Sequence, residues 1–185
     1  MNLKALMLSV ALLVPSSIMA ADYQIDTKGA HAFINFKASH LGFSWLHGRF
    51  NTFTGNFTYD ADSLENSKVV VTIDTRSIDS NHAERDKHLR SDDFLSADKH
   101  PEAKFVSTKV VDRGNGAFDI VGDFTLNGET NSVTINAKKI GEGKDPWGGY
   151  RAGFEGTATI NMKDYNFKNA WGEVHLDLHV EGIKQ

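Results

Sequence analysis

The stretch Glu173-Val-His-Leu-Asp-Leu-His-Val-Glu181 decides the class of fold. Its apolar residues occupy every second position, and charged residues and histidines occupy the positions between them. Successive side chains of a β-strand point to opposite faces, so this spacing predicts a strand with one buried and one wet face. Strands of this kind are typical of antiparallel sheets.

The same alternation recurs over most of the chain. Further runs are Tyr150–Met162, Phe118–Leu126, Val133–Ala137 and Val69–Ile73, with shorter ones at 34–36, 53–59 and around Phe105. Asn127-Gly128 lies between two runs and is typical of a type I′ hairpin turn. Gly114-Asn115-Gly116 predicts a second tight turn, and a longer loop is expected from Gly141 to Gly149. We therefore predict an all-β protein with about eight antiparallel strands.

Strand length favours a closed barrel. At about 3.3 Å per residue, Tyr150–Met162 would span roughly 40 Å, whereas a usual strand has about 5–6 residues. Long strands joined by short hairpins suit an up-and-down, lipocalin-like barrel, which can hold one elongated ligand. A two-sheet sandwich is the alternative, because alternation alone does not separate the two architectures.

One segment breaks the alternation and predicts a short helical insertion near residues 81–95. Asn81 is the expected N-cap, and Glu84 would complete a capping box. Apolar residues are scarce before Phe94, so the helix should lie on the outside or at the mouth of the barrel. Phe94 and Leu95 would then anchor the segment to the sheet.

The N-terminus has the composition of a secretory signal. Lys4 precedes an apolar run from Leu6 to Met19, and Ala20 and Ala21 offer a cleavage site. We expect residues 1–20 to be a signal peptide and residues 21–185 a single domain, with an uncleaved anchor as the alternative. Export of a chain with no cysteine makes the periplasm the simplest location. After cleavage we expect no integral membrane segment.

Charge and motifs narrow the function. Without residues 1–20 the chain carries 19 basic and 24 acidic residues, a net charge of −5. That balance argues against nucleic acid or an anionic membrane surface as a partner. The chain has no GxSxG, SxxK or phosphate-binding glycine motif, so covalent catalysis finds no support.

Two features suggest a ligand site, each with a plainer reading. Small residues share the inward register: Gly55, Gly122, Ala152, Gly156 and Ala158. They either leave a cavity for a guest or make room for opposing aromatic rings. His82 and Asp86 are four residues apart on the helix and could face a polar headgroup or a metal, or form only a surface pair. No HExxH motif accompanies them, so no metal site is predicted.

Five segments resemble the YceI family: His40–Phe50, Asn81–Phe94, His100–Phe105, Leu126–Thr130 and Asp145–Phe154. The resemblance runs over essentially all of residues 21–185. It implies a lipocalin-like periplasmic barrel that holds a long-chain lipid: a polyisoprenoid such as a polyprenyl pyrophosphate, an isoprenoid quinone or a fatty-acid derivative. It also implies a carrier that needs no cofactor, rather than an enzyme.

Apolar inward positions, the helix and the family motifs together give the candidate ligand-binding residues Phe36, His40, Phe43, Trp45, Arg49, Phe50, His82, Asp86, Leu89, Phe94, Phe105, Trp147 and Phe154. The polar end of the ligand is expected at the mouth, near His40, Arg49, His82 and Asp86. One alternative is an enzyme acting on a bound lipid, with His82 or His40 as acid or base. Another is a filled structural barrel that binds a protein partner. The sequence leaves open whether the chain forms a homodimer.

Overall fold

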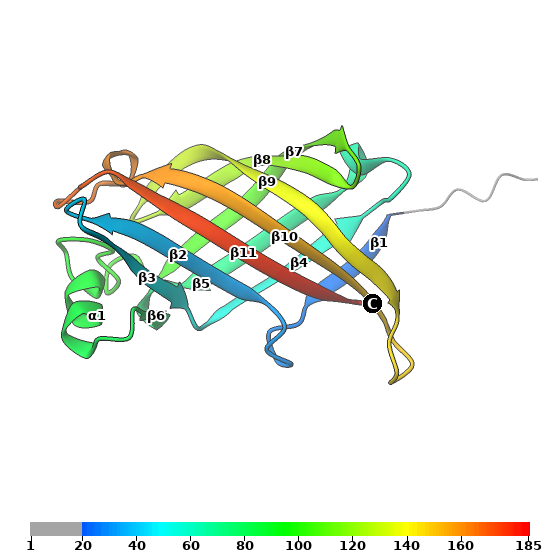
Figure 1. The fold of residues 1–185 in the computed structure, drawn as a ribbon, viewed down its shortest axis with the longest axis horizontal. Helices are drawn as coiled ribbons and strands as arrows, with labels where there is room; N and C mark the ends of the chain where they lie inside the picture. Colours follow the sequence, from blue (N-terminus) through cyan, green and yellow to red (C-terminus); the bar gives the residue numbers. More distant parts are fainter. Residues whose placement is uncertain (1–19) are drawn as a thin grey trace, which may run out of the picture.

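The alternating segments form the wall of a barrel (Figure 1). The computed structural model describes residues 20–185, so the predicted signal peptide lies outside the described residues apart from Ala20. The strands are β1 (Ala21–Ile25), β2 (Phe33–His40), β3 (Ser44–Phe50), β4 (Phe53–Tyr59), β5 (Lys68–Asp74), β6 (Ile78–Asp79), β7 (Glu102–Gly114), β8 (Ala117–Leu126), β9 (Glu129–Lys144), β10 (Tyr150–Asn161) and β11 (Glu173–Lys184). Three 3-10 turns, at Leu64–Asn66, Thr75–Ser77 and Met162–Tyr165, and the α-helix α1 (Ala83–Arg90) complete the list.

The eleven strands occupy eight positions around the barrel, because at three of these positions two short strands lie end to end. β11 pairs with β2 along Val174–His179 and with β1 at its C-terminal end. β3 and β4 pair in turn with β2 and β1, and β6 and β5 pair with β3 and β4. The remaining neighbours follow chain order, all antiparallel, from β5 through β7 to β11. The predicted eight-stranded antiparallel barrel with one short helix is confirmed.

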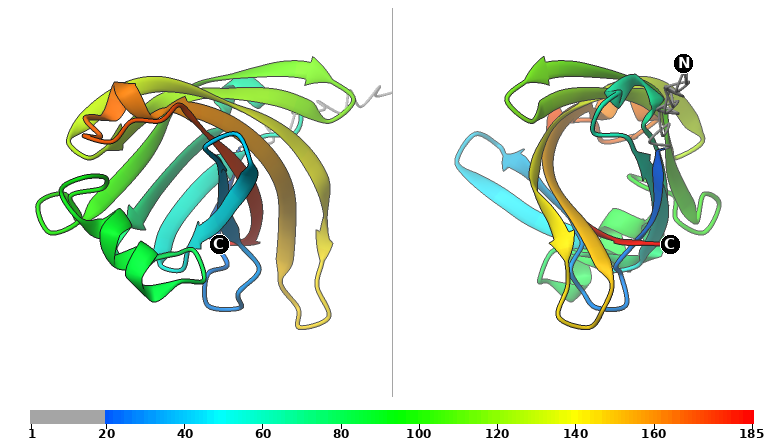
Figure 2. Two further views of the ribbon diagram at one scale, coloured as in Figure 1. Left: turned by 60° about the vertical axis from the view of Figure 1, so that its left-hand side comes forward. Right: turned by 90° about the vertical axis from the view of Figure 1, so that its right-hand side faces the viewer.

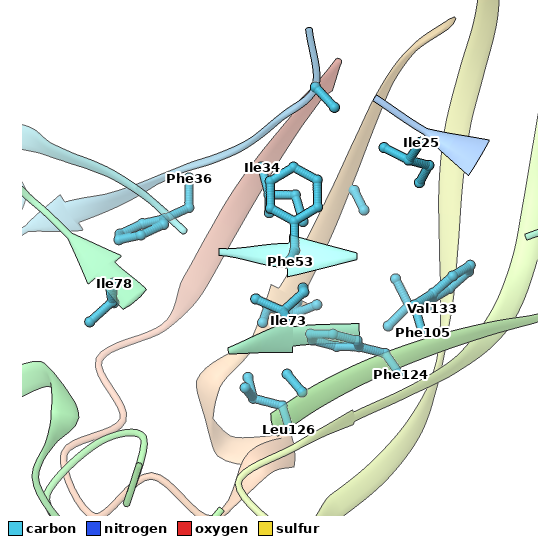
Figure 3. Packing of buried hydrophobic residues seen from close by; sticks show 14 of the residues in the cluster. Ile25, Ile34, Phe36, Phe53, Ile73, Ile78, Phe105, Phe124, Leu126 and Val133 are labelled. Atoms are coloured by element: carbon cyan, nitrogen blue, oxygen red, sulfur yellow. The ribbon is translucent and has the colours of Figure 1, made fainter. Parts of the chain in front are cut away.

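Buried apolar side chains from all sides of the wall point into the barrel (Figure 3). The inward glycines make room for neighbouring side chains. A Cβ atom on Gly122 would lie 2.5 Å from the Phe105 ring, and one on Gly55 would lie 2.8 Å from the Ile25 side chain. At these two positions the plainer reading of the glycines is the correct one.

The helical insertion lies at one end of the barrel, as predicted, but it begins at a different residue (Figure 1). The N-cap is His82, whose Nδ1 accepts a hydrogen bond from the Arg85 backbone N–H at 3.3 Å. The prediction of Asn81 as N-cap is wrong, because Asn81 adopts a left-handed conformation (φ 62°) and donates its N–H to Asp79. Phe94 and Leu95 are buried and anchor the segment, as expected.

The turns follow the predictions with one exception. Asn127 and Gly128 both have positive φ, at 49° and 84°, which fits the predicted type I′ turn. The loop expected from Gly141 is wrong, because β9 continues to Lys144, with Gly141 paired to Gly153 and Gly143 paired to Arg151. Among residues 20–185, no helix combines the length and apolar character that crossing a bilayer requires.

Candidate ligand-binding site

The barrel interior contains a hollow that we call the inner chamber. Its cavity volume is about 140 Å³. Side chains of Val, Ile, Leu, Phe and Ala from most of the strands line the chamber, and Glu155 is the one charged residue beside it. Because Glu155 points outward and is exposed, the chamber surface itself is apolar.

A second hollow, the outer chamber, lies next to the first on the side of α1 and has a cavity volume of about 100 Å³. Every residue that lines it has an apolar side chain, including Leu89 and Phe94 of the helical insertion. The two chambers share four lining residues: Phe50, Ile73, Phe124 and Leu176. They therefore adjoin inside the barrel, and we call the two chambers together the apolar path.

Inward side chains that keep accessible surface show that protein atoms do not fill the apolar path. Val71, Ile120 and Leu178 point into the closed barrel, yet each is only half-buried. Inward side chains of a filled barrel meet in the middle and lose nearly all their accessible surface. The interior is thus a cavity, which the alternation alone could not establish.

The outer chamber opens into a polar vestibule. His40 and Trp45 of the β2–β3 hairpin, Glu84, Arg85 and His88 of α1, and Trp171 of the β10–β11 connection line it. Figure 2 (left) shows these segments around the open end of the barrel. Leu46 and Trp171 line both the outer chamber and the vestibule, so the apolar path meets polar groups there.

A gap in the wall accounts for the position of the vestibule. β3 pairs with β6 only at Arg49 and Phe50. Within the described chain, the edge of β3 from Ser44 to Gly48 that faces away from β2 has no partner strand. Side chains from β3 and α1 face each other across the opening.

The guanidinium of Arg85 in the vestibule is held in place by hydrogen bonds. The Arg85 Nε donates a hydrogen bond to Ser80 Oγ at 2.7 Å, and its Nη2 donates to the Ser80 carbonyl. His88 pairs with Asp93 at 3.1 Å, and its ring meets the edge of the Phe94 ring at a centroid distance of 5.0 Å. A fixed guanidinium and two imidazoles near an apolar path suit the polar end of an amphiphile.

The structure brings eight of the predicted residues to this path. Phe36, Phe50, Leu89, Phe94, Phe105 and Phe154 line the chambers, and His40 and Trp45 line the vestibule. Phe43 lies on the tip of the β2–β3 hairpin, and Trp147 lies in the β9–β10 loop at the opposite end of the barrel. Contact between any of these residues and a ligand stays a prediction.

Three residues expected at the mouth line neither the chambers nor the vestibule. Arg49 points outward, because Leu46, Gly48 and Phe50 occupy the inward register of β3, and its guanidinium lies 3.7 Å from Asp79. The exposed His82 caps the helix.

Asp86 is buried, and its Oδ1 accepts hydrogen bonds from the backbone N–H of Ser80 at 2.8 Å and from the Ser80 hydroxyl. Because Asp86 is buried against Ser80, both readings of His82 and Asp86, a shared headgroup or metal and a surface pair, are wrong.

Six residues of the vestibule escaped the sequence analysis: Ser44, Leu46, Glu84, Arg85, His88 and Trp171. Alternation with Gly48 and Phe50 would have placed Leu46 inward. No local pattern identifies Trp171, because it lies in an irregular connection. Arg85 and His88 lie on the predicted helix, but which of its faces meets β3 depends on the Ser80–Asp86 hydrogen bonds.

The opposite end of the barrel carries an ionic network. Arg151 Nη1 lies 2.7 Å from Asp26 and 2.5 Å from Glu181, and its Nε lies 2.9 Å from Asp145. A hydrogen bond from His31, followed by those from Arg151, lowers the pKa of Asp26 from 3.8 to about 2. Asp26, His31 and Glu181 have the spacing of a metal site, but the guanidinium already occupies their carboxylates.

Comparisons with known proteins agree with the fold. The family model for the YceI-like domain matches residues 23–182. A UPF0312 protein of Shewanella denitrificans is 58% identical over 188 residues, which cover 100% of this chain and 98% of the relative. The crystal structure of a Campylobacter jejuni YceI protein superposes with a TM-score of 0.73 at 27% identity, covering 80% of this chain and 91% of that one.

A polyisoprenoid binding domain from Saccharophagus degradans has the same fold, with a TM-score of 0.63 at 15% identity, covering 90% of this chain and 100% of that one. Because the family model spans most of the chain and the Shewanella relative matches it from end to end, the chain belongs to the YceI-like family.

Proposed function

We propose that the chain binds one long-chain lipid of the isoprenoid type in its barrel and carries it through the periplasm. The observation that carries this proposal is the apolar path formed by the adjoining inner and outer chambers. Two adjoining apolar chambers suit a single extended chain that occupies both. The name of the Saccharophagus domain, a polyisoprenoid binding domain, supports the same class of ligand.

Burial of apolar surface supplies the affinity. At about 0.8 kcal/mol per CH₂-sized group, each five-carbon unit gains about 4 kcal/mol before entropy is subtracted. Three such units approach the roughly 12 kcal/mol of a nanomolar complex. The two chambers would therefore discriminate mainly by chain length, and the vestibule would select the polar end, with Arg85 favouring an anionic or carbonyl-bearing group.

The polarity of the site supports a carrier rather than an enzyme. A chain in either chamber meets apolar side chains, which offer no general acid or base. The two vestibule imidazoles belong to His40 and His88, and His88 is paired with Asp93. If His40 acted as an acid or base, a lipid added to the purified protein would be returned chemically altered.

Adjacent residues of β9 provide a matched test. Ile135 points into the inner chamber, and Thr134 points outward and is exposed. Ile135→Asp introduces a carboxylate that bound lipid must desolvate, whereas Thr134→Asp introduces the same charge in water. The full chain and both variants would be purified from their own periplasm, extracted with organic solvent and analysed by mass spectrometry.

We expect the wild type and Thr134→Asp to release one lipid per chain and folded Ile135→Asp to release at most a tenth of that amount. Circular dichroism and a cooperative thermal transition would verify that Ile135→Asp is folded. Equal lipid content in all three proteins, or none in the wild type, would refute the proposal. Conversion of added lipid by the wild type would favour the enzyme.

A further inference from the structure

The rim of the vestibule exposes large apolar side chains. On the β2–β3 hairpin tip, 73% of Leu41 and 85% of Phe43 are exposed, and Trp45 and Trp171 beside the vestibule are each more than half exposed. We call these four residues the apolar rim. Trp171 also lines the outer chamber, so the rim continues the apolar surface of the path out to solvent.

The backbone conformation at the hairpin tip is unfavourable for Leu41. The Phe43 N–H donates to the His40 carbonyl at 3.0 Å, closing a turn in which Leu41 (φ 54°) and Gly42 (φ 79°) both have positive φ. Asn, Asp and Gly tolerate this conformation, and a leucine there is strained. The chain uses Asn115 and Asn127 at the corresponding positions of two other hairpin turns. A strained leucine pointing into solvent therefore indicates a role outside the fold.

We propose that the apolar rim docks the barrel on the surface of a phospholipid bilayer, with the hairpin tip inserted among the lipids. Convex, separate apolar tips suit a fluid surface, whereas a protein partner needs a broad complementary face. Tryptophan side chains favour the membrane interface, and Lys37, whose Nζ lies 4.9 Å from the centre of the Trp45 ring, can reach headgroup phosphates. The proposal rests on the proposed function in one respect: the purpose of docking is taken to be the exchange of bound lipid through the vestibule.

Insertion rather than charge should drive this binding. The net charge of the chain without residues 1–20 is negative and disfavours an anionic surface. Binding should therefore occur on zwitterionic phosphatidylcholine vesicles and depend little on salt. Removing the phenyl group of Phe43 should weaken partitioning about tenfold, the amount expected from burying one large apolar side chain.

The three tryptophans of the chain provide a built-in measurement. Trp45 and Trp171 belong to the rim, and Trp147 lies at the opposite end of the barrel, where it packs near Arg151. With phosphatidylcholine brominated in its acyl chains, Trp147→Phe should keep the fluorescence quenching seen in the wild type. A variant with both Trp45→Phe and Trp171→Phe should lose it. Quenching of Trp147 alone would overturn the proposal.

Flotation with the same vesicles tests the rim by mutation. Phe43→Asp should partition about tenfold less than the wild type, and Ile140→Asp, a change at an exposed β9 position away from the rim, should not differ from it. Leu41→Asn should also bind less while its thermal midpoint rises, because the strain in the turn is relieved. Unchanged partitioning of Phe43→Asp would refute the docking role, and a lowered midpoint for Leu41→Asn would refute the strain in the turn.

The pore variant separates this proposal from the proposed function. Ile135→Asp keeps the rim, so it should float with vesicles although it carries no lipid. A wild type that carries lipid but does not float would refute docking alone. A third outcome would assign the rim to a second copy of the chain. In that case the wild type self-associates in native mass spectrometry, Phe43→Asp does not, and neither protein binds vesicles.

Discussion

At the scale of single residues, Tyr165 is unusual because its hydroxyl is buried without a hydrogen-bond partner in the described part of the chain. The residue is 1% exposed, and its ring packs edge-on against Phe124. An unpaired buried hydroxyl costs roughly 1–3 kcal/mol. Tyr165→Phe should therefore raise the free energy of unfolding by about 1 kcal/mol, measured by urea denaturation at neutral pH. A loss of stability would mean that water or cargo bonds the hydroxyl.

The same residue predicts a response to alkali. Burial raises the pKa of Tyr165 from 10.0 to about 12. The unfolded chain therefore loses this proton first, and the stability that Tyr165 contributes is complete below about pH 10 and declines as pH rises toward 12. Thermal midpoints of the wild type and Tyr165→Phe should diverge over that range, with the wild type falling faster. Parallel curves would contradict the shift.

Side-chain direction could be predicted from the sequence at this scale, and polar contacts could not. Alternation correctly placed Phe36 and Phe154 inward, because strand geometry fixes the direction of every second side chain. It would also have placed Arg49 outward had it been applied along β3. The partner of Asp86 is Ser80, which precedes the helix and belongs to no motif, so only the folded chain reveals it.

At the scale of elements, the Ser80–Asp86 contact attaches α1 to the barrel. Both residues are buried, and Asp86 accepts two hydrogen bonds from Ser80. Asp86→Ala leaves the Ser80 N–H unpaired and should destabilise the protein by about 1–3 kcal/mol. Hydrogen exchange should rise first in α1 and at Ser80, because the helix has few apolar contacts of its own.

The exposed Glu84, on the same helix, supplies the control. Glu84→Ala should change stability by less than about 0.5 kcal/mol, as surface substitutions usually do. If Asp86→Ala accelerated exchange evenly over the whole barrel, α1 would have to be an integral part of the folding unit rather than an attached cover.

The length of an element decided whether the sequence revealed it. Long alternating runs such as Phe118–Leu126 were predicted, whereas β1 (Ala21–Ile25) and β6 (Ile78–Asp79) are too short to show a period. Glycines at 141 and 143 suggested a loop, but they lie within β9, opposite Gly153 and Arg151 of β10. Pairing with β10 therefore decides that these glycines lie in a strand, and local composition does not reveal that pairing.

At the scale of the whole molecule, the Arg151 network joins three distant segments: the β1–β2 connection, the β9–β10 loop and β11. Arg151 also lowers the pKa of Asp145, and its own pKa is raised by the three carboxylates. Because the Asp26 pKa is about 2 when folded and 3.8 otherwise, its contribution to stability is complete above about pH 4. That contribution disappears as the pH falls from about 4 to about 2.

Asp26→Asn tests this linkage. The variant should melt well below the wild type at neutral pH, and the difference between their thermal midpoints should shrink between about pH 4 and pH 2. Asp177→Asn, a change at an exposed position of β11, should leave the midpoint nearly unchanged throughout. A wild-type advantage that persisted at pH 2 would show that Asp26 acts through packing rather than charge.

The hollow barrel predicts a conflict between stability and cargo. Space inside a protein forgoes dispersion contacts, so filling it should stabilise the empty protein. Ala158→Leu and Val71→Phe add carbon atoms to the inner chamber, and each should raise the free energy of unfolding of the lipid-free protein by about 1 kcal/mol. The same variants should release less lipid on extraction.

Lipid must first be removed from the wild type, because bound cargo stabilises the folded state by mass action. Two variants that both lost stability would mean that the chamber collapses without cargo, and that the lipid holds it open.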